Sequence, residues 1–223
     1  GRPEQTVMVN ASPKGNDIVQ QTYYDDFGRE SRKYLPYAAD GSGEFRPDAL
    51  NEVKNYYMNT ISGKNKTDSL VYAQTAFENS PLNRVLNTTG VGQDWKSAPV
   101  TYDYQTNATA LSTWDENGGS KSFGANTLYV NQVTDEQGTV TKEYKNLLGQ
   151  VVLKETKTIT PNETIKTYYI YDDFGLLRTV VPPLATSPAN KELCYFYTYD
   201  ERHLMITKKL PGPEIIYMVY DKR

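Results

Sequence analysis

The sequence predicts a mainly β fold, an antiparallel meander of β-hairpins forming a curved sheet, with one or two short helices within residues 46–80. Three observations favour it. A short phrase of tyrosine, aspartate and, three residues after the aspartate, glycine or a substitute returns along the chain. The copies follow runs rich in tyrosine and β-branched residues, as strands do. Three closing positions, Gly149, Gly175 and His203, are 26 and 28 residues apart, a spacing typical of a repeated supersecondary unit.

The phrase occurs in four variants and one weaker copy. The fullest variants begin at Tyr24 and Tyr171, a third begins at Tyr199, and the last is cut short after Tyr220. The weaker copy has asparagine in place of aspartate. The turn residues identified in this way are Tyr24, Asp25, Gly28, Asn146, Gly149, Tyr171, Asp172, Gly175, Tyr199, Asp200, His203, Tyr220 and Asp221.

Each part of the phrase suits the tip of a hairpin. The tyrosine ends the incoming strand, with its ring half-buried and its hydroxyl near a polar partner. The aspartate or asparagine accepts a hydrogen bond from a backbone N–H two residues on. Glycine then supplies the positive φ that such a loop requires, and His203 takes this place in the third copy because histidine tolerates positive φ better than most residues.

The amino-terminal region is predicted to be β-rich with a helical insertion. Residues 18–24 and 29–36 read as two strands around the first turn. Pro47 and Asp48 mark a helix start, and apolar residues at helical spacing continue to Met58. Residues 62–68 read as a polar loop. Residues 70–77 fit either a second short helical turn or an irregular strand.

The carboxy-terminal part is predicted to be a continuous meander. Residues 100–111 suggest a strand and Gly118 and Gly119 a loop, after which strands and turns alternate from Thr127 onward. We therefore expect two regions, 1–126 with one hairpin of this type and the helical insertion, and 127–223 with the repeats. Tyr195, Tyr197 and Tyr199 share one strand face, which predicts a sheet covered on the other face and lined with tyrosines here.

The repeated phrase resembles the YD repeats of the Rhs family. Residues 77–85, 125–130 and 219–223 also resemble the amino-terminal region of large Rhs-like surface proteins of Gram-negative bacteria. The resemblance implies a β-sheet that winds into a hollow shell around a carboxy-terminal polypeptide, with a role in toxin delivery or contact between cells. It also implies an extracellular or cell-envelope location in bacteria. The chain contains neither a toxin module nor the family's core cleavage segment.

Composition limits the possible partners. The net charge of −3 and pI near 5.3 argue against a nucleic-acid surface and do not favour acidic sugars or lipids. Cys194 is the single cysteine and is expected to pack as a small apolar residue, and no apolar run is long enough to insert into a membrane. The amino terminus lacks a charged-then-apolar leader, so we expect a mature or trimmed fragment. The incomplete phrase at residues 220–223 predicts that the polypeptide continues and that its remainder is the main partner.

No catalytic or metal-binding site is predicted. His203 is the only histidine, so every catalytic triad or multi-histidine metal site would have to include this turn residue. The Asp25-Asp26 and Asp172-Asp173 pairs lack the ligand series of a calcium loop. A glycoside hydrolase needs two opposed carboxylates, and no motif nominates them. We therefore expect a non-enzymatic scaffold without a cofactor.

Carbohydrate binding is the alternative function. The chain contains 19 tyrosines, and together with Trp95 and Trp114 they offer aromatic faces on which sugar rings stack. Packing within the sheet accounts for most of these rings. Trp95 and Trp114 remain the candidate ligand-binding residues, with glycans as possible partners.

Overall fold

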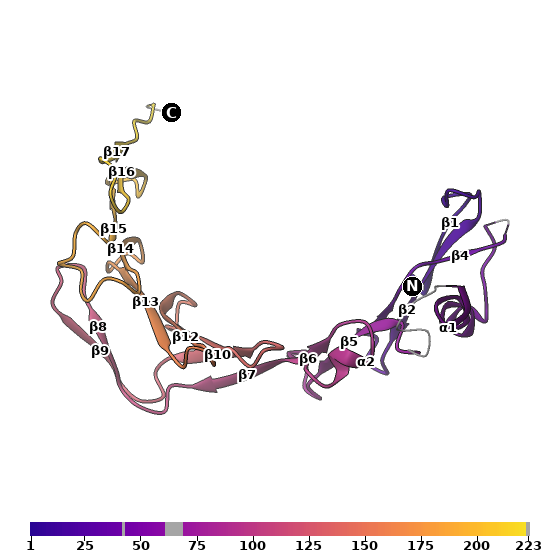
Figure 1. Ribbon diagram of the computed structural model, residues 1–223. Coiled ribbons are helices and arrows are strands. Elements are labelled where there is room, and N and C mark those ends of the chain that lie inside the picture. The colour runs from indigo at the N-terminus through magenta and orange to yellow at the C-terminus, as the bar shows by residue number, and fades with distance from the viewer. Residues whose placement is uncertain (42, 61–68, 222–223) are drawn as a thin grey trace. The chain divides into compact units, whose positions relative to one another are not determined.

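The computed structural model describes residues 1–41, 43–60 and 69–221. They form open antiparallel β-sheet with two helices and no closed barrel (Figure 1), which confirms the predicted fold class. The chain divides into two compact units, residues 1–102 with 135–137 and residues 103–134 with 138–223. The division at residue 127 stays a prediction.

The first unit is a sheet with one covering helix. In it β2 pairs with β1, β3 and the short β4, and the path continues from β3 through β5 and β6 to the start of β7. The elements are β1 (Gln5–Met8), β2 (Asp17–Tyr24), β3 (Glu30–Tyr34), β4 (Tyr37–Ala39), α1 (Ala49–Thr60), β5 (Tyr72–Phe77), β6 (Val85–Thr89), α2 (Gln93–Lys96) and β7 (Val100–Thr106).

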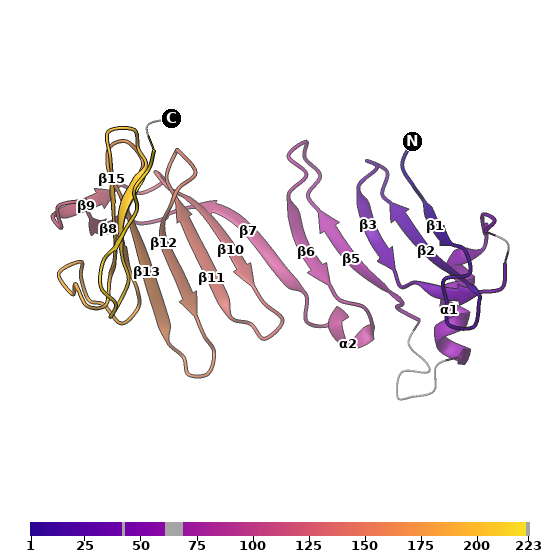
Figure 2. The same ribbon diagram turned by 90° about the horizontal axis from the view of Figure 1, so that it is seen from above.

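Helix α1 covers the β2–β4 end of this unit, as Figure 2 shows. At its start, the N–H groups of Asn51 and Glu52 both donate hydrogen bonds to the carbonyl of Asp48. Val53 is fully buried in a core with Val19 and Tyr34, since apolar residues of α1 recur at helical spacing. The helix predicted from Pro47 to Met58 is therefore present.

Of the one or two short helices predicted within residues 46–80, the described residues of that region contain one, α1. The helical alternative for residues 70–77 is wrong, because Tyr72–Phe77 pair with β3 and β6 as strand β5. The second helix is the short α2, at Gln93–Lys96. The polar loop predicted at residues 62–68 lies outside the described residues. Neither helix in the described ranges has the length and apolar character needed to cross a membrane.

The second unit is an eight-stranded meander with a separate hairpin. Strands β10 to β17 pair in sequence order, and Figure 2 shows β10 to β13 side by side. The hairpin is β8–β9. The strands are β8 (Leu111–Trp114), β9 (Ser120–Phe123), β10 (Tyr129–Thr134), β11 (Val140–Lys145), β12 (Val151–Lys157), β13 (Thr164–Tyr171), β14 (Leu177–Val181), β15 (Tyr195–Tyr199), β16 (Met205–Lys209) and β17 (Ile216–Tyr217).

One face of this sheet is covered. Ile170, Val181 and Cys194 form a buried cluster, against which Trp114 of β8 packs. The Trp114 ring meets the Tyr168 ring edge-on, with centroids 5.0 Å apart. Cys194 therefore has the packing role expected of it.

Candidate functional site

The hairpin turns share one hydrogen-bonding pattern. At Asp172 the Oδ1 atom accepts the N–H groups of Phe174 at 3.0 Å and Leu176 at 2.8 Å, and the N–H of Gly175 donates to the Asp172 carbonyl at 3.0 Å. Asp25, Asn146 and Asp200 accept the same two N–H groups of their own turns. The side-chain oxygen thus satisfies backbone donors that a reversal of the chain leaves without strand partners.

Every one of these turns closes on a residue in the left-handed region. The φ angles are 72° at Gly28, 79° at Gly149, 80° at Gly175 and 63° at His203. The strand register shifts at the residue before the turn, so that Tyr171 faces Leu177 and Tyr199 faces Met205. This arrangement is a turn followed by a bulge, which increases the local twist of the hairpin.

The tyrosine of each phrase ties its hairpin to the preceding turn. The Tyr171 hydroxyl donates to the Val151 carbonyl at 3.1 Å, and Tyr199 donates to the Leu177 carbonyl at 3.0 Å. Tyr220 repeats the contact with Met205 at 2.9 Å. Each acceptor lies two residues after the left-handed residue of the previous turn. We call these three contacts the tyrosine latches. They connect each turn to the one before it, which the sequence pattern of a single turn does not reveal.

A comparable hydroxyl contact occurs in the first unit. Tyr24 donates to the Pro3 carbonyl at 3.0 Å, on the segment that leads into β1. Its partner does not belong to a hairpin turn, because Pro3 precedes β1. The Tyr24 contact therefore anchors the amino-terminal segment.

Arginine links two turns of the first unit. The Arg29 Nε donates to Asp25 Oδ2 at 2.8 Å, while its Nη1 donates to the Glu78 carbonyl at 2.9 Å and to Asn83 Oδ1 at 3.1 Å. Its guanidinium also lies 4.7 Å from the Phe77 ring centroid. In the second unit, Arg178 pairs with Asp172 at 2.8 Å and lies over the Tyr199 ring at 5.5 Å.

Two further turns of this kind were missed by the sequence analysis. Asp115 Oδ1 accepts the N–H groups of Asn117 and Gly119, and Gly118 has a φ of 81°. The signal was present in the sequence, since an aspartate stands three residues before Gly118. In the other turn the Ser80 hydroxyl accepts the Leu82 N–H and Asn83, with a φ of 53°, takes the place of the glycine, while the Arg84 N–H donates to Glu78 Oε1. The repeated phrase has neither serine at its first turn position nor asparagine at its closing position, so it does not predict this turn.

The charges around the turns favour ionised carboxylates. Hydrogen bonds from the Arg84 side chain and the Ser80 hydroxyl lower the pKa of Glu78 to about 2. The Leu204 N–H and the Arg202 side chain lower the pKa of Asp200. Burial raises the pKa of Asp25, but the backbone and side chain of Arg29 outweigh it and the net shift is downward. These carboxylates are acceptors for their own turns.

The other titratable candidates are dispersed. No group of three or more His, Cys, Asp or Glu side chains suited to a metal ion occurs within residues 1–41, 43–60 and 69–221. The His203 ring packs against the Phe174 ring, with centroids 5.2 Å apart. Cys194 is fully buried, and burial raises the pKa of its thiol. In the part of the chain that the structure describes, both His203 and Cys194 are therefore placed in packing contacts.

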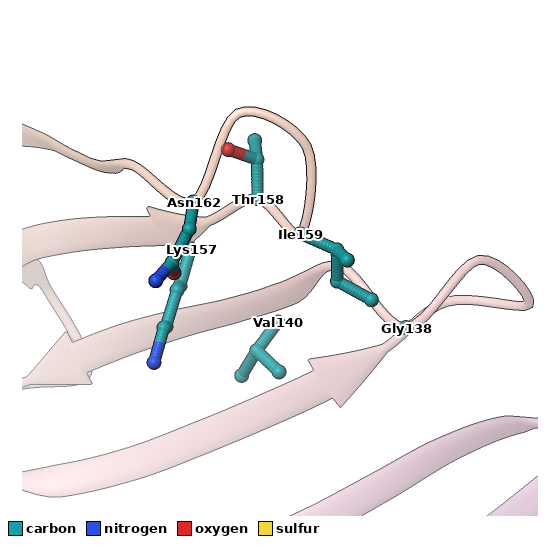
Figure 3. Close-up of a pocket in the computed structure, with 6 residues that line it drawn as sticks. All are labelled: Gly138, Val140, Lys157, Thr158, Ile159 and Asn162. Atoms are coloured by element: carbon teal, nitrogen blue, oxygen red, sulfur yellow. The ribbon is translucent and has the colours of Figure 1, made fainter.

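The hollow drawn in Figure 3 offers few polar groups to a ligand. It has a volume of about 440 Å³ and lies between the start of β11 and the loop after β12. Ile159 points toward Gly138 across its mouth, and Lys157 brings the one charged side chain. A binding site normally combines an apolar wall with several converging polar groups. This hollow therefore does not stand out as a candidate.

The two tryptophans have different environments. Trp114 packs on Tyr168 at the covered face of the second unit. Trp95 belongs to the first unit and is 48% exposed, with its ring beside Gly90. The two side chains therefore do not form one binding surface within a single unit. Glycan binding at Trp95 stays a prediction.

Comparisons with known proteins agree with this geometry. Residues 1–108 match a family described as "Domain of unknown function (DUF6443)". No curated protein matches the chain. The fold is similar to the crystal structure of TcdB2-TccC3 without its hypervariable C-terminal region, with a TM-score of 0.58 and 15% identity over 93% of this chain. It is similar also to TcdB2-TccC3 (TM-score 0.57, 14% identity, 98% of this chain) and to TcdB2-TccC3-Cdc42 (TM-score 0.55, 16% identity, 90% of this chain).

The likeness is one of fold. This chain spans only 9%, 10% and 9% of those three chains, respectively. The DUF6443 match ends at residue 108, close to the end of the first compact unit at Tyr102. Together, the comparisons show a family match over the first 108 residues and a fold shared with parts of these larger proteins.

Replacing Gly149 with alanine should lower the free energy of unfolding by roughly 1–2 kcal/mol, the cost of a left-handed backbone for a residue with a Cβ. Nothing lies within 4 Å of the added Cβ, so the loss would isolate the backbone effect. Chemical denaturation measures it. Gly124→Ala is the control, because Gly124 is not left-handed and its Cβ would make ordinary contact with Thr127. Equal losses in both variants would contradict the assignment.

Removing one latch should weaken the sheet. Tyr199→Phe deletes the hydroxyl that donates to Leu177, at a cost of about 1 kcal/mol in the free energy of unfolding. Tyr129→Phe is the matched control. The Tyr129 ring is 56% exposed, and its hydroxyl makes no hydrogen bond within the described part of the chain. If both variants unfold at the same denaturant concentration, the latch has no energetic role.

The Glu78 carboxylate should make stability depend on pH. Its folded pKa of about 2 is below the ordinary 4.5, so its contribution is present above pH 4.5 and is lost as the pH falls toward 2. The difference in Tm between the wild type and Glu78→Gln should shrink over that window. Thermal unfolding at a series of pH values measures it. Glu136→Gln, at an exposed position, should show no such trend, and a constant Glu78 difference would refute the prediction.

Proposed function

We propose that this chain is a non-enzymatic scaffold segment of an Rhs-like protein, contributing β-hairpins to a shell that encloses or displays a downstream module. The observation that carries the proposal is the row of tyrosine latches, in which successive hairpins hold one another through the same contact. Such an arrangement extends by adding further copies, because each new tyrosine needs only the turn before it. A wall can be built in this way to any length.

The chemistry of the turns supports a structural role. The carboxylates of Asp172 and Asp200 are engaged by their own turns and by Arg178 and Arg202. Groups held in this way stabilise the backbone of the turn. The similarity of fold to TcdB2-TccC3 is consistent with a non-enzymatic scaffold.

The last strand offers a surface for the remainder of the polypeptide. Strand β17 pairs with β16 on one side, and Ile216 and Tyr217 are 47% and 71% exposed. A strand with one free edge accepts another strand through its backbone. We propose that further repeats of the same polypeptide occupy this edge, in a secreted or envelope-associated bacterial protein that acts in toxin delivery or contact between cells.

Limited proteolysis of the full-length protein tests the proposal. The segment after residue 223 should be protected from a broad-specificity protease in the wild type. It should be cut faster when the wall is weakened by the double variant Tyr171→Phe and Tyr199→Phe. Tyr129→Phe is the control. A downstream segment that is cut at the same rate in all three proteins would contradict the enclosing role.

A further inference from the structure

A second hollow in the second unit has more polar character than the one in Figure 3. It has a volume of about 390 Å³ and lies between the segment 105–111 and the face of strands β10 to β13. The strands contribute four polar side chains to its wall: Lys142, Tyr144, Glu155 and Lys166. This volume is within the range of small-molecule sites, about 300–1,000 Å³.

The strand register gathers the three charges. Lys142 of β11 faces Glu155 of β12, and Glu155 faces Lys166 of β13, so the three form one row across neighbouring strands. Tyr144 is two residues after Lys142 and therefore projects from the same face. The pairing of strands β11, β12 and β13 is by itself enough to produce this row of charges.

Residues 105–111 form the roof of the hollow, and a buried side-chain amide holds them in place. Asn107 is 4% exposed, and its Nδ2 donates to the carbonyls of Thr109 at 2.8 Å and Gly124 at 2.7 Å. Its Oδ1 accepts the N–H of Leu128 at 2.8 Å. These three bonds fix the segment 105–111 to the chain that leads into β10. The hollow is therefore preformed, which reduces the entropic cost of binding.

Two of the wall groups have unused hydrogen-bonding capacity. Lys166 forms an ion pair with Glu155 at 3.5 Å, whereas the Lys142 ammonium has no ion pair in the described ranges. The Tyr144 hydroxyl likewise has no hydrogen-bond partner there. Burial and the nearby Glu155 raise the pKa of Tyr144, so its hydroxyl keeps its proton and is able to donate.

We propose that this hollow binds a small hydroxylated carboxylate of the sugar-acid class. The ligand carboxylate would form an ion pair with Lys142 and accept a hydrogen bond from the Tyr144 hydroxyl. A ligand hydroxyl would donate a hydrogen bond to Glu155. Two lysines and one glutamate give the wall a net charge of +1, although the whole chain carries −3. The site is independent of the scaffold role and goes beyond it.

Titration with D-glucuronate and D-galacturonate, followed by NMR of ¹⁵N-labelled protein, tests the proposal. Saturable shifts should appear at residues 105–111 and 142–144 with at least one of the two acids. D-glucose at the same concentrations should give no saturable shift, because it lacks the carboxylate. Absence of saturation with both acids would overturn the proposal, as would equal binding of glucose.

Variants distinguish this pocket from general charge attraction. Lys142→Gln should weaken binding roughly tenfold or more, the usual effect of losing a charge-assisted hydrogen bond. Lys154→Gln is the control, since it removes the same charge from the opposite sheet face, where Lys154 faces Glu143. Tm values for both variants would confirm that each one folds. Equal affinity in the two variants would show that Lys142 does not hold the ligand.

Discussion

The two hydrogen bonds accepted by the first side chain of each turn are the constraint on which the sheet depends. They fix where a strand ends, and they place the next left-handed residue three positions later. The bulge that follows sets the register, so it also decides which side chains face the core. In this way Asp172 influences the burial of Ile170 and Val181 through the hydrogen bonds that its side chain accepts in the turn between β13 and β14.

The latches add a dependence between neighbouring hairpins. A two-stranded hairpin alone buries too little surface to be stable in water. Here the hydroxyl groups of Tyr171 and Tyr199 each donate to a backbone carbonyl of the preceding hairpin. The stability of the second unit is therefore expected to be shared among adjacent hairpins, as in other repeat proteins. A substitution that destabilises one turn should therefore lower the stability of the adjacent hairpin first.

Local chemistry made part of the structure predictable from the sequence. An aspartate or asparagine three residues before a glycine specifies a turn without reference to the rest of the chain, so the positions of Gly149 and Gly175 could be anticipated. Residues 70–77 could not be assigned, because Tyr72 to Phe77 are strand only through pairing with β3 and β6. The latches and the roof held by Asn107 also join distant residues, and periodicity carries no information about them.

The most promising place for ligand chemistry is where the regular repeat is interrupted. Along the repeated hairpins, the carboxylates are engaged by their own turns and the tyrosine hydroxyls by the preceding turn. Residues 105–111, which lead from β7 into β8, belong to no such turn and are held in place by the side chain of Asn107. The strands beneath keep their pairing, so Lys142 and Tyr144 are presented to a hollow instead of to another hairpin. A sheet built from repeated hairpins can thereby form a hollow without any change to the repeat itself.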